Sequence, residues 1–178
     1  MDKNKAVFLD RDGVINKDTG YVHKIEDFLI LPGVIESLKI LQSKGYKLII
    51  VTNQGGIAKK YYTLDDFTKL NNHMLSIFEE NKIKIEKVYF CPHAPEEDCE
   101  CRKPKTKFVY DAEKEFNIDL KNSWVIGDKM SDIKMGEDCG CRALLVESEY
   151  VKNVDVMKFK DIYECANYIL VNSVSAYE

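Results

Sequence analysis

The sequence predicts an α/β protein built on a doubly wound, parallel β-sheet with helices on both faces. Short apolar runs rich in β-branched residues alternate along the chain with longer segments of helical periodicity. Polar and acidic side chains directly follow several of the apolar runs, and ligands bind at this edge of open parallel sheets. The chain has 178 residues, of which 45% are hydrophobic and 31% charged, so we expect one globular domain over residues 1–178.

The apolar runs give the order of the strands. We predict strands at Ala6–Leu9, Lys47–Val51, Val88–Phe90, Trp124–Ile126 and Ala143–Val146, with a weaker candidate at Val154–Met157. A polar residue or a cysteine follows each of the first four within two positions, as Asp10 follows the first. The sheet is therefore expected to gather polar side chains along one edge.

Helix signals fill the connections between these runs. Residues 34–43 follow Pro32 and Gly33 and precede Gly45, which are start and stop signals for a helix. Thr63 lies three residues before Asp66, as in a capping box, and the apolar stripe that follows has helical spacing and is expected to pack on the sheet. Shorter helices are predicted at 106–116 and 131–138, and a closing helix at 161–170.

Charge and hydropathy limit the classes of partner. The formal net charge is −4 and no long basic run occurs, which disfavours nucleic acid and acidic membranes as partners. No apolar segment approaches the roughly 20 residues that span a bilayer, and the N-terminus does not resemble a signal peptide. We expect a cytoplasmic monomer that binds a small molecule.

Two aspartates stand at the end of the first predicted strand. Asp10 and Asp12 are two positions apart, so their side chains can face one cavity if the backbone is extended. Their mutual repulsion would be relieved by a hard divalent cation such as Mg²⁺. Asp128 follows another strand and can supply a further carboxylate, and Asp132 lies one helical turn later, where it can support the ligands.

This arrangement suits phosphoryl transfer. One carboxylate can attack phosphorus to form an aspartyl-phosphate, and the second can protonate the leaving oxygen and then deprotonate the attacking water. Thr52, neighbouring backbone amides and Lys103 can stabilise the charge on the phosphoryl oxygens. An isolated Asp-x-Asp-Gly could also be ordinary turn chemistry, but the partners expected after the other strands favour a site.

A cysteine-rich loop separates the third strand from Lys103. Cys91, His93, Cys99 and Cys101 offer three thiolates and one imidazole, the full tetrahedral set of a structural zinc site. Such a zinc ion would hold the loop, residues 91–101, so that the following Arg102 and Lys103 are fixed; free reduced thiols are the alternative. Cys139, Cys141 and Cys165 are expected in the core.

The motifs FLDRDG, VTN, RKP and GDKMSD together resemble those of the haloacid dehalogenase superfamily of phosphohydrolases. The resemblance spans roughly residues 6–146 and implies the fold of that superfamily. It implies that Asp10 is the nucleophile, Asp12 the acid and base, and Thr52 and Lys103 the phosphate stabilisers. It further implies that Mg²⁺ is held by Asp10, Asp128 and the backbone carbonyl of Asp12.

A narrower set of motifs, including GYVHKIEDF, VTNQGGIAKKYYT and CPH with CEC, is similar to the D-glycero-D-manno-heptose 1,7-bisphosphate 7-phosphatases. These are near relatives of the histidinol-phosphate phosphatases and have no large cap domain. The resemblance implies cytoplasmic hydrolysis of a small phosphorylated sugar for surface polysaccharide synthesis. It places substrate near Asp18, Thr19, Gly20, Tyr21, Asn53, Gln54, Gly55, Arg102 and Lys129.

The chain departs from that family pattern in two places. Where the family commonly has Ala-Arg-Gly, this chain has Ala58-Lys59-Lys60, and a lysine in place of glycine could alter the loop. Only five residues separate His93 from Cys99, which is short for the family. Both departures bear on the rim of the expected pocket.

Three alternative functions differ from the heptose bisphosphatase. Histidinol-phosphate phosphatase uses the same chemistry on a cationic substrate, whereas the basic residues expected at the rim suit a second phosphate. A phosphoacceptor signalling domain would gain nothing from the acid and base two residues after its nucleophile. A zinc-organised binding module without turnover would leave the convergent motifs unexplained.

Overall fold

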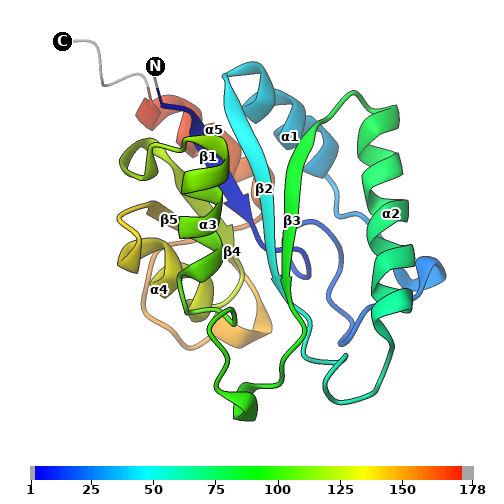
Figure 1. Ribbon diagram of the computed structural model, residues 1–178. Coiled ribbons are helices and arrows are strands. Elements are labelled where there is room, and N and C mark those ends of the chain that lie inside the picture. The colour runs from blue at the N-terminus through cyan, green and yellow to red at the C-terminus, as the bar shows by residue number, and fades with distance from the viewer. Residues whose placement is uncertain (1–2, 174–178) are drawn as a thin grey trace.

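The computed structural model describes residues 3–173 and contains a parallel sheet with helices on both faces (Figure 1). The strands are β1 (Lys5–Leu9), β2 (Tyr46–Asn53), β3 (Ile85–Cys91), β4 (Trp124–Gly127), β5 (Arg142–Val146) and β6 (Lys158–Phe159). The helices are α1 (Val34–Ser43), α2 (Leu64–Glu80), α3 (Lys107–Phe116), α4 (Met130–Asp138) and α5 (Ile162–Ser173). Short 3₁₀ turns lie at Ile25–Asp27, Pro95–Glu97, Leu120–Asn122 and Glu149–Val151.

The strand order is β3-β2-β1-β4-β5-β6, and all neighbours are parallel. The chain therefore winds outward from β1 to β3, returns to the centre at β4, and winds outward in the other direction. Ligand sites form at such a reversal point, outside the carboxyl ends of the two central strands. Here that point lies between β1 and β4.

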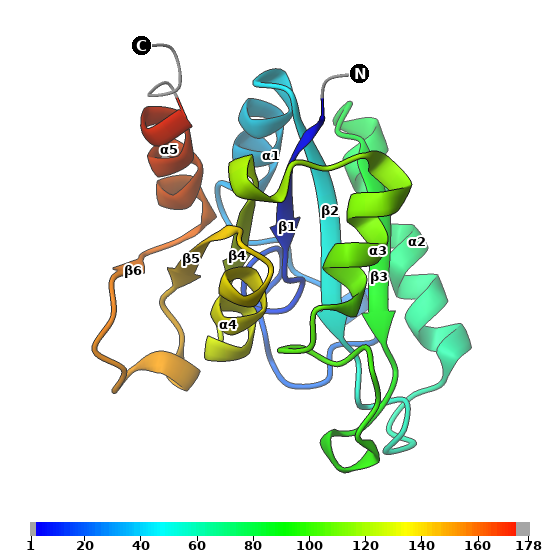
Figure 2. The ribbon, with the colours of Figure 1, turned by 60° about the vertical axis from the view of Figure 1, so that its left-hand side comes forward.

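Alternation along the strands divides the core between the two faces of the sheet. Val7 and Leu9 of β1 join α1, α2 and α5 in one buried cluster, and Ala6 and Phe8 join α3 and α4 in the other. Figure 2 shows α3 and α4 in front of the sheet and α1 behind it. The buried faces fix the strand register, because a slip by one residue would turn apolar side chains toward the wrong cluster.

The predicted fold is confirmed, and most predicted elements agree within a few residues. Helix α1 has the predicted bounds, and the capping box at Thr63 and Asp66 is present. Cys139, Cys141 and Cys165 are buried as expected. The weak strand at residues 154–157 is wrong: β6 comes later, because the β5 ladder continues at Lys158 while Met157 is 63% exposed.

Among residues 3–173, no helix is both long enough and apolar enough to cross a bilayer.

Candidate active site

The carboxyl ends of the strands meet at one edge of the sheet, at the bottom of Figures 1 and 2, where the long loops gather. A pocket of about 440 Å³ lies there. Its lining comprises Asp10, Asp12, Asp18, Gly20, Tyr21, Asn53, Gln54, Gly55, Lys59, Tyr62, Pro95, Arg102, Lys103, Lys129, Ser131, Asp132 and Tyr150. Most of the residues singled out from the sequence thus line one cavity.

Lys103 forms the centre of a buried ionic cluster. Its Nζ lies 2.8 Å from Oδ1 of Asp10 and 2.7 Å from Oδ1 of Asp132, and it donates to the Val51 carbonyl at 2.7 Å. The three side chains are at most 7% exposed. All three ammonium protons are therefore used by buried acceptors, and one oxygen of Asp10 is held in a fixed position.

The pKa directions follow from this cluster. Burial acts to raise the pKa of Asp10, but the charge and hydrogen bond of Lys103 outweigh it and lower the pKa. Burial and the charge of Asp10 raise the pKa of Asp132 to about 6, although Lys103 opposes them. The pKa of Lys103 is raised because the two carboxylates outweigh its burial. Asp10 is thus kept ionised, as a nucleophile requires.

Asp128 is the carboxylate in this cluster that protein donors leave unsatisfied. It is 1% exposed, and neither carboxylate oxygen has a hydrogen-bond partner within the described residues. Burial and the charge of Asp10 raise its pKa to about 8. A buried carboxylate without donors is costly unless a cation is bound.

The surroundings of Asp128 supply oxygen ligands for such a cation. One carboxylate oxygen from each of Asp10, Asp128 and Asp132 lies within 4.8 Å of the others. Gly13 has a φ of +90°, and a Cβ there would lie 2.2 Å from Oδ2 of Asp128. This oxygen-rich cluster fits Mg²⁺, which prefers carboxylate and water ligands.

Asp12 is held by more donors than the sequence indicated. Its Oδ1 accepts from Arg11 Nη2 at 2.9 Å and from Asn16 Nδ2 at 3.0 Å, and its Oδ2 accepts from Gln54 Nε2 at 3.1 Å. Arg11 is only 1% exposed and also donates to the Val22 carbonyl at 2.8 Å. Sequence reasoning gave no role to Arg11, because arginine inside a loop motif normally points to solvent.

Three expected residues have more specific surroundings than the sequence implied. Thr52 is buried and does not line the pocket; its hydroxyl accepts from Gln54 at 2.8 Å. Asn53 braces the Lys103 backbone, accepting from its N–H at 3.0 Å and donating to its carbonyl at 3.3 Å. Thr19 is exposed and is not among the pocket-lining residues, so its contact with substrate stays a prediction.

A second group joins two loops at the pocket wall. Asp18 Oδ2 accepts from the Tyr150 hydroxyl at 3.0 Å and lies 3.7 Å from Lys129 Nζ, which lies 4.1 Å from the centre of the Tyr150 ring. Asp18 follows β1 and Tyr150 follows β5, so this contact joins the loops after these two strands. The sequence carried no signal for Tyr150, which is an isolated aromatic residue in a polar loop.

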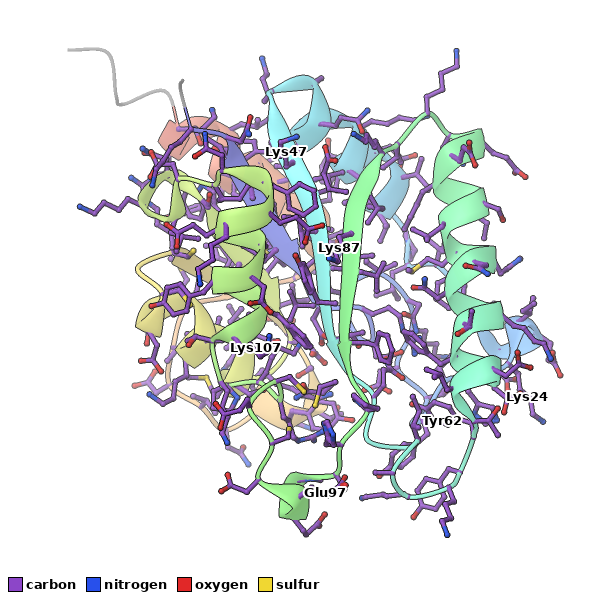
Figure 3. All side chains as sticks on the ribbon, viewed as in Figure 1. Lys24, Lys47, Tyr62, Lys87, Glu97 and Lys107 are labelled. Carbon is purple, nitrogen blue, oxygen red and sulfur yellow. The ribbon has the colours of Figure 1, made fainter. Side chains whose placement is uncertain are left out.

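The cysteine-rich loop brings all four expected ligands together below the sheet, with Glu97 near its tip (Figure 3). Cys91 Sγ lies 3.5 Å from Cys99 Sγ and 3.0 Å from Cys101 Sγ, and His93 Nδ1 lies 3.4 Å from Cys101 Sγ. Bonds of about 2.3 Å to a tetrahedral zinc ion place sulfur ligands roughly 3.8 Å apart. The donor set therefore fits zinc, and a bound ion would hold Cys91 and Cys101 farther apart than 3.0 Å.

The loop after β2 keeps a compact turn despite Lys60. Lys60 has a φ of +60°, in the region that favours glycine. The same turn brings Lys59 to the pocket, where its Nζ donates to the Tyr21 hydroxyl at 3.0 Å. The lysine therefore adopts the backbone conformation that glycine would take there.

Known proteins resemble this chain over nearly its whole length. A family model described as polynucleotide kinase 3 phosphatase matches residues 5–160. The D-glycero-alpha-D-manno-heptose-1,7-bisphosphate 7-phosphatase of Campylobacter jejuni is 46% identical, over 93% of this chain and 96% of that protein. This chain belongs to the heptose-1,7-bisphosphate 7-phosphatase family. Another family member, the D-glycero-beta-D-manno-heptose-1,7-bisphosphate 7-phosphatase of Helicobacter pylori, is 51% identical over 76% of this chain and 79% of that protein.

The fold is also that of a solved family structure. The D,D-heptose 1,7-bisphosphate phosphatase from B. bronchiseptica, complexed with magnesium and phosphate, superimposes with a TM-score of 0.86 over 94% of this chain and 99% of that chain. The two sequences are 23% identical, so this likeness concerns the fold.

Proposed function

We propose that this protein hydrolyses the 7-phosphate of D-glycero-D-manno-heptose 1,7-bisphosphate through an aspartyl-phosphate at Asp10. The observation that carries the proposal is the pairing of Asp10 with Lys103 beside the unsatisfied Asp128, at the sheet's reversal point, in a member of the heptose bisphosphatase family. Residues 1–178 act as one phosphatase domain, with the zinc loop at 91–101. Family membership also supports an enzyme over the signalling-domain alternative.

The proposed reaction divides the chemistry between the first two aspartates. Asp10 attacks phosphorus, and the bond to the sugar O7 breaks as Asp12 gives that oxygen a proton. Asp12 then takes a proton from water, the water oxygen attacks the phosphoryl group, and inorganic phosphate leaves as the Asp10 carboxylate is restored. Thr52 donates to a phosphoryl oxygen, while Lys103 keeps Asp10 ionised and correctly turned.

Asp10, Asp128 and the Asp12 carbonyl would hold Mg²⁺. When bound, Mg²⁺ neutralises charge on the phosphate and on the acidic cluster. Cys91, His93, Cys99 and Cys101 would hold a structural Zn²⁺, because four protein ligands leave no position open for a catalytic water.

Basic residues support a substrate with a second phosphate. Lys59, Arg102 and Lys129 line the pocket together with the catalytic cluster. Arg102 is anchored by a 3.1 Å hydrogen bond from its Nη1 to the His93 carbonyl, which ties it to the zinc loop. A cationic substrate such as histidinol phosphate would meet these charges unfavourably. The cytoplasmic location, the monomeric state and the absence of nucleic-acid and membrane partners stay predictions.

The test is phosphate release with Mg²⁺ from the heptose bisphosphate and from histidinol phosphate, with Asp10→Asn as the blank. Both anomers of the heptose are needed, since relatives are named for each. We expect kcat/KM for at least one heptose anomer to exceed that for histidinol phosphate by about tenfold or more. A preference for histidinol phosphate would contradict the substrate assignment. Phosphate release by Asp10→Asn would contradict the assignment of Asp10 as the nucleophile.

A further inference from the structure

The side chain of Gln54 joins three groups of the active site. Its Nε2 donates to Asp12 Oδ2 at 3.1 Å and to Thr52 Oγ1 at 2.8 Å. Its Oε1 accepts from the Tyr62 hydroxyl at 2.5 Å. Gln54 is 2% exposed, so this amide has little solvent to compensate for a lost partner.

The chemistry of these partners fixes which way the amide faces. Oδ2 of Asp12 also accepts from Arg11 Nη2 at 3.0 Å and so serves as an acceptor in this network, which means that the –NH₂ group of Gln54 faces it. The Thr52 oxygen then accepts from the same –NH₂ group, which leaves the Thr52 hydroxyl hydrogen free to donate to a phosphoryl oxygen. A rotated amide would direct its carbonyl at the carboxylate and lose the bond to Asp12, and its carbonyl would take up the Thr52 hydroxyl hydrogen as an acceptor.

The remaining partner, Tyr62, holds the amide in this orientation from its far side. Burial raises the pKa of Tyr62 to about 12, so its hydroxyl keeps its proton and can donate to Oε1. The ring is fixed by a parallel stack on His23, with centroids 4.9 Å apart. Gly56 makes room for it, since a Cβ there would lie 2.2 Å from Cε1 of Tyr62.

We propose that Tyr62 is a positioning residue that acts through the Gln54 amide, holding the Asp12 carboxylate and directing the Thr52 hydroxyl toward phosphate. The proposal deepens the proposed phosphatase function and rests on it. Tyr62 starts the segment that leads into α2 (Figure 3), so the loop after β2 contributes to catalysis as well as to the pocket wall.

The first test is Tyr62→Phe, which keeps the ring and removes the hydroxyl. With the heptose bisphosphate, we expect kcat to fall about three- to tenfold, the range for one lost hydrogen bond, and KM to change less than about twofold. With p-nitrophenyl phosphate the loss should be smaller, because nitrophenolate leaves without a proton from Asp12. Equal losses on both substrates would overturn the link to Asp12.

Tyr61→Phe is the matched control. Tyr61 is 58% exposed, and its ring packs edge-on against Tyr21, a contact that the phenylalanine variant keeps. Removing the Tyr61 hydroxyl should leave kcat and KM unchanged with both substrates. Losses matching those of Tyr62→Phe would show a general sensitivity of the loop and overturn the specific role.

A double-variant cycle tests whether Tyr62 acts through Gln54. In a Gln54→Ala background, Tyr62→Phe should lower kcat by no more than about 1.5-fold, because the amide it orients is absent. If the loss in kcat of the double variant equals the product of the two single-variant losses, the proposal is overturned. Gly56→Ala, which displaces the Tyr62 ring, should reproduce the kinetic pattern of Tyr62→Phe.

A readout independent of activity separates this proposal from the proposed function. The side-chain –NH₂ resonances of Gln54 can be assigned by NMR from their absence in Gln54→Ala. Tyr62→Phe should shift them, and Tyr61→Phe should not; unchanged resonances in Tyr62→Phe would overturn the orienting role. If the wild-type protein released no phosphate, the proposed function would fail while this measurement still decided whether Tyr62 orients the amide.

Discussion

Replacing Lys103 by methionine should destabilise the protein strongly, because it removes the cation from a buried cluster while keeping a side chain of similar length. Asp10, Asp132 and the Val51 carbonyl would each lose a donor at 2.7–2.8 Å. Lys103 and its two acidic partners are at most 7% exposed, so water cannot easily replace the ammonium group.

The magnitude follows from the cost of leaving buried groups unpaired. Removing one partner of a buried ion pair costs about 3–5 kcal/mol. The orphaned carbonyl adds about 1 kcal/mol, and burial of the methionine side chain returns a similar amount. We therefore expect a loss of about 4 kcal/mol, a large share of the roughly 5–15 kcal/mol that stabilises a domain.

The penalty should depend on pH with a definite sign. Without Lys103, the folded-state pKa values of Asp10 and Asp132 rise. The folded variant then binds more protons than the unfolded chain above about pH 4, so its stability falls as pH rises. In the wild type, Asp10 has a lowered pKa and contributes stability above that pH. The difference in stability should be largest near pH 7 and smaller near pH 4.

The assay is equilibrium urea unfolding in magnesium-free buffer at both pH values. With a slope of about 2 kcal/mol/M, the expected loss moves the midpoint by about 2 M at pH 7. Lys134→Met is the control, since it breaks an exposed i,i+4 pair with Asp138 and should cost at most about 0.5 kcal/mol. A midpoint shift no larger than the control's would refute the reasoning.

Three further outcomes test the metal sites and the loop after β2. Gly13→Ala should lower kcat/KM at least about tenfold and weaken the dependence of activity on Mg²⁺, because the added Cβ would overlap Asp128. The control is Gly45→Ala: Gly45 has a similar φ of +82°, but a Cβ there would have nothing within 4 Å, so the variant should change only stability. Cys101→Ser should lower bound zinc, measured by elemental analysis, and speed proteolysis in the loop at 91–101, whereas Cys139→Ser should keep its zinc. Lys60→Gly should raise unfolding stability by about 0.5–1 kcal/mol by relieving a positive φ, whereas Lys39→Gly inside α1 should lower it by about 1 kcal/mol; the opposite sign for Lys60→Gly would contradict the strain.

The fold could be predicted because local signals agreed with the global arrangement. The apolar runs, the glycines after helices and the capping box at Thr63 each describe interactions within a few residues. The last strand could not be predicted, because β6 is only two residues long and is defined by pairing with β5. A two-residue strand has no periodicity of its own.

The sequence predicted which residues gather at the site better than it predicted the contacts that they make there. Asp10 and Asp128 follow neighbouring central strands, so the sequence already indicated that they approach each other. The sequence could not show that Lys103 gives all its protons to protein acceptors, or that Arg11 turns inward to Asp12. Such contacts depend on packing between segments far apart in the chain, or on a side-chain rotamer.

Lys60 shows how this chain accommodates a lysine at a backbone position that favours glycine. The turn around it is held by backbone hydrogen bonds, including Lys60 N–H to the Ile57 carbonyl at 3.0 Å and Tyr61 N–H to the Gly56 carbonyl at 2.9 Å. These bonds hold the lysine at its positive φ, at a cost to stability of about 1–2 kcal/mol. The same turn places Lys59 where it donates a hydrogen bond to Tyr21, and Tyr62 where it donates one to Gln54. We infer that the lysine affects stability more than substrate contacts, since the contacts around it do not involve its side chain.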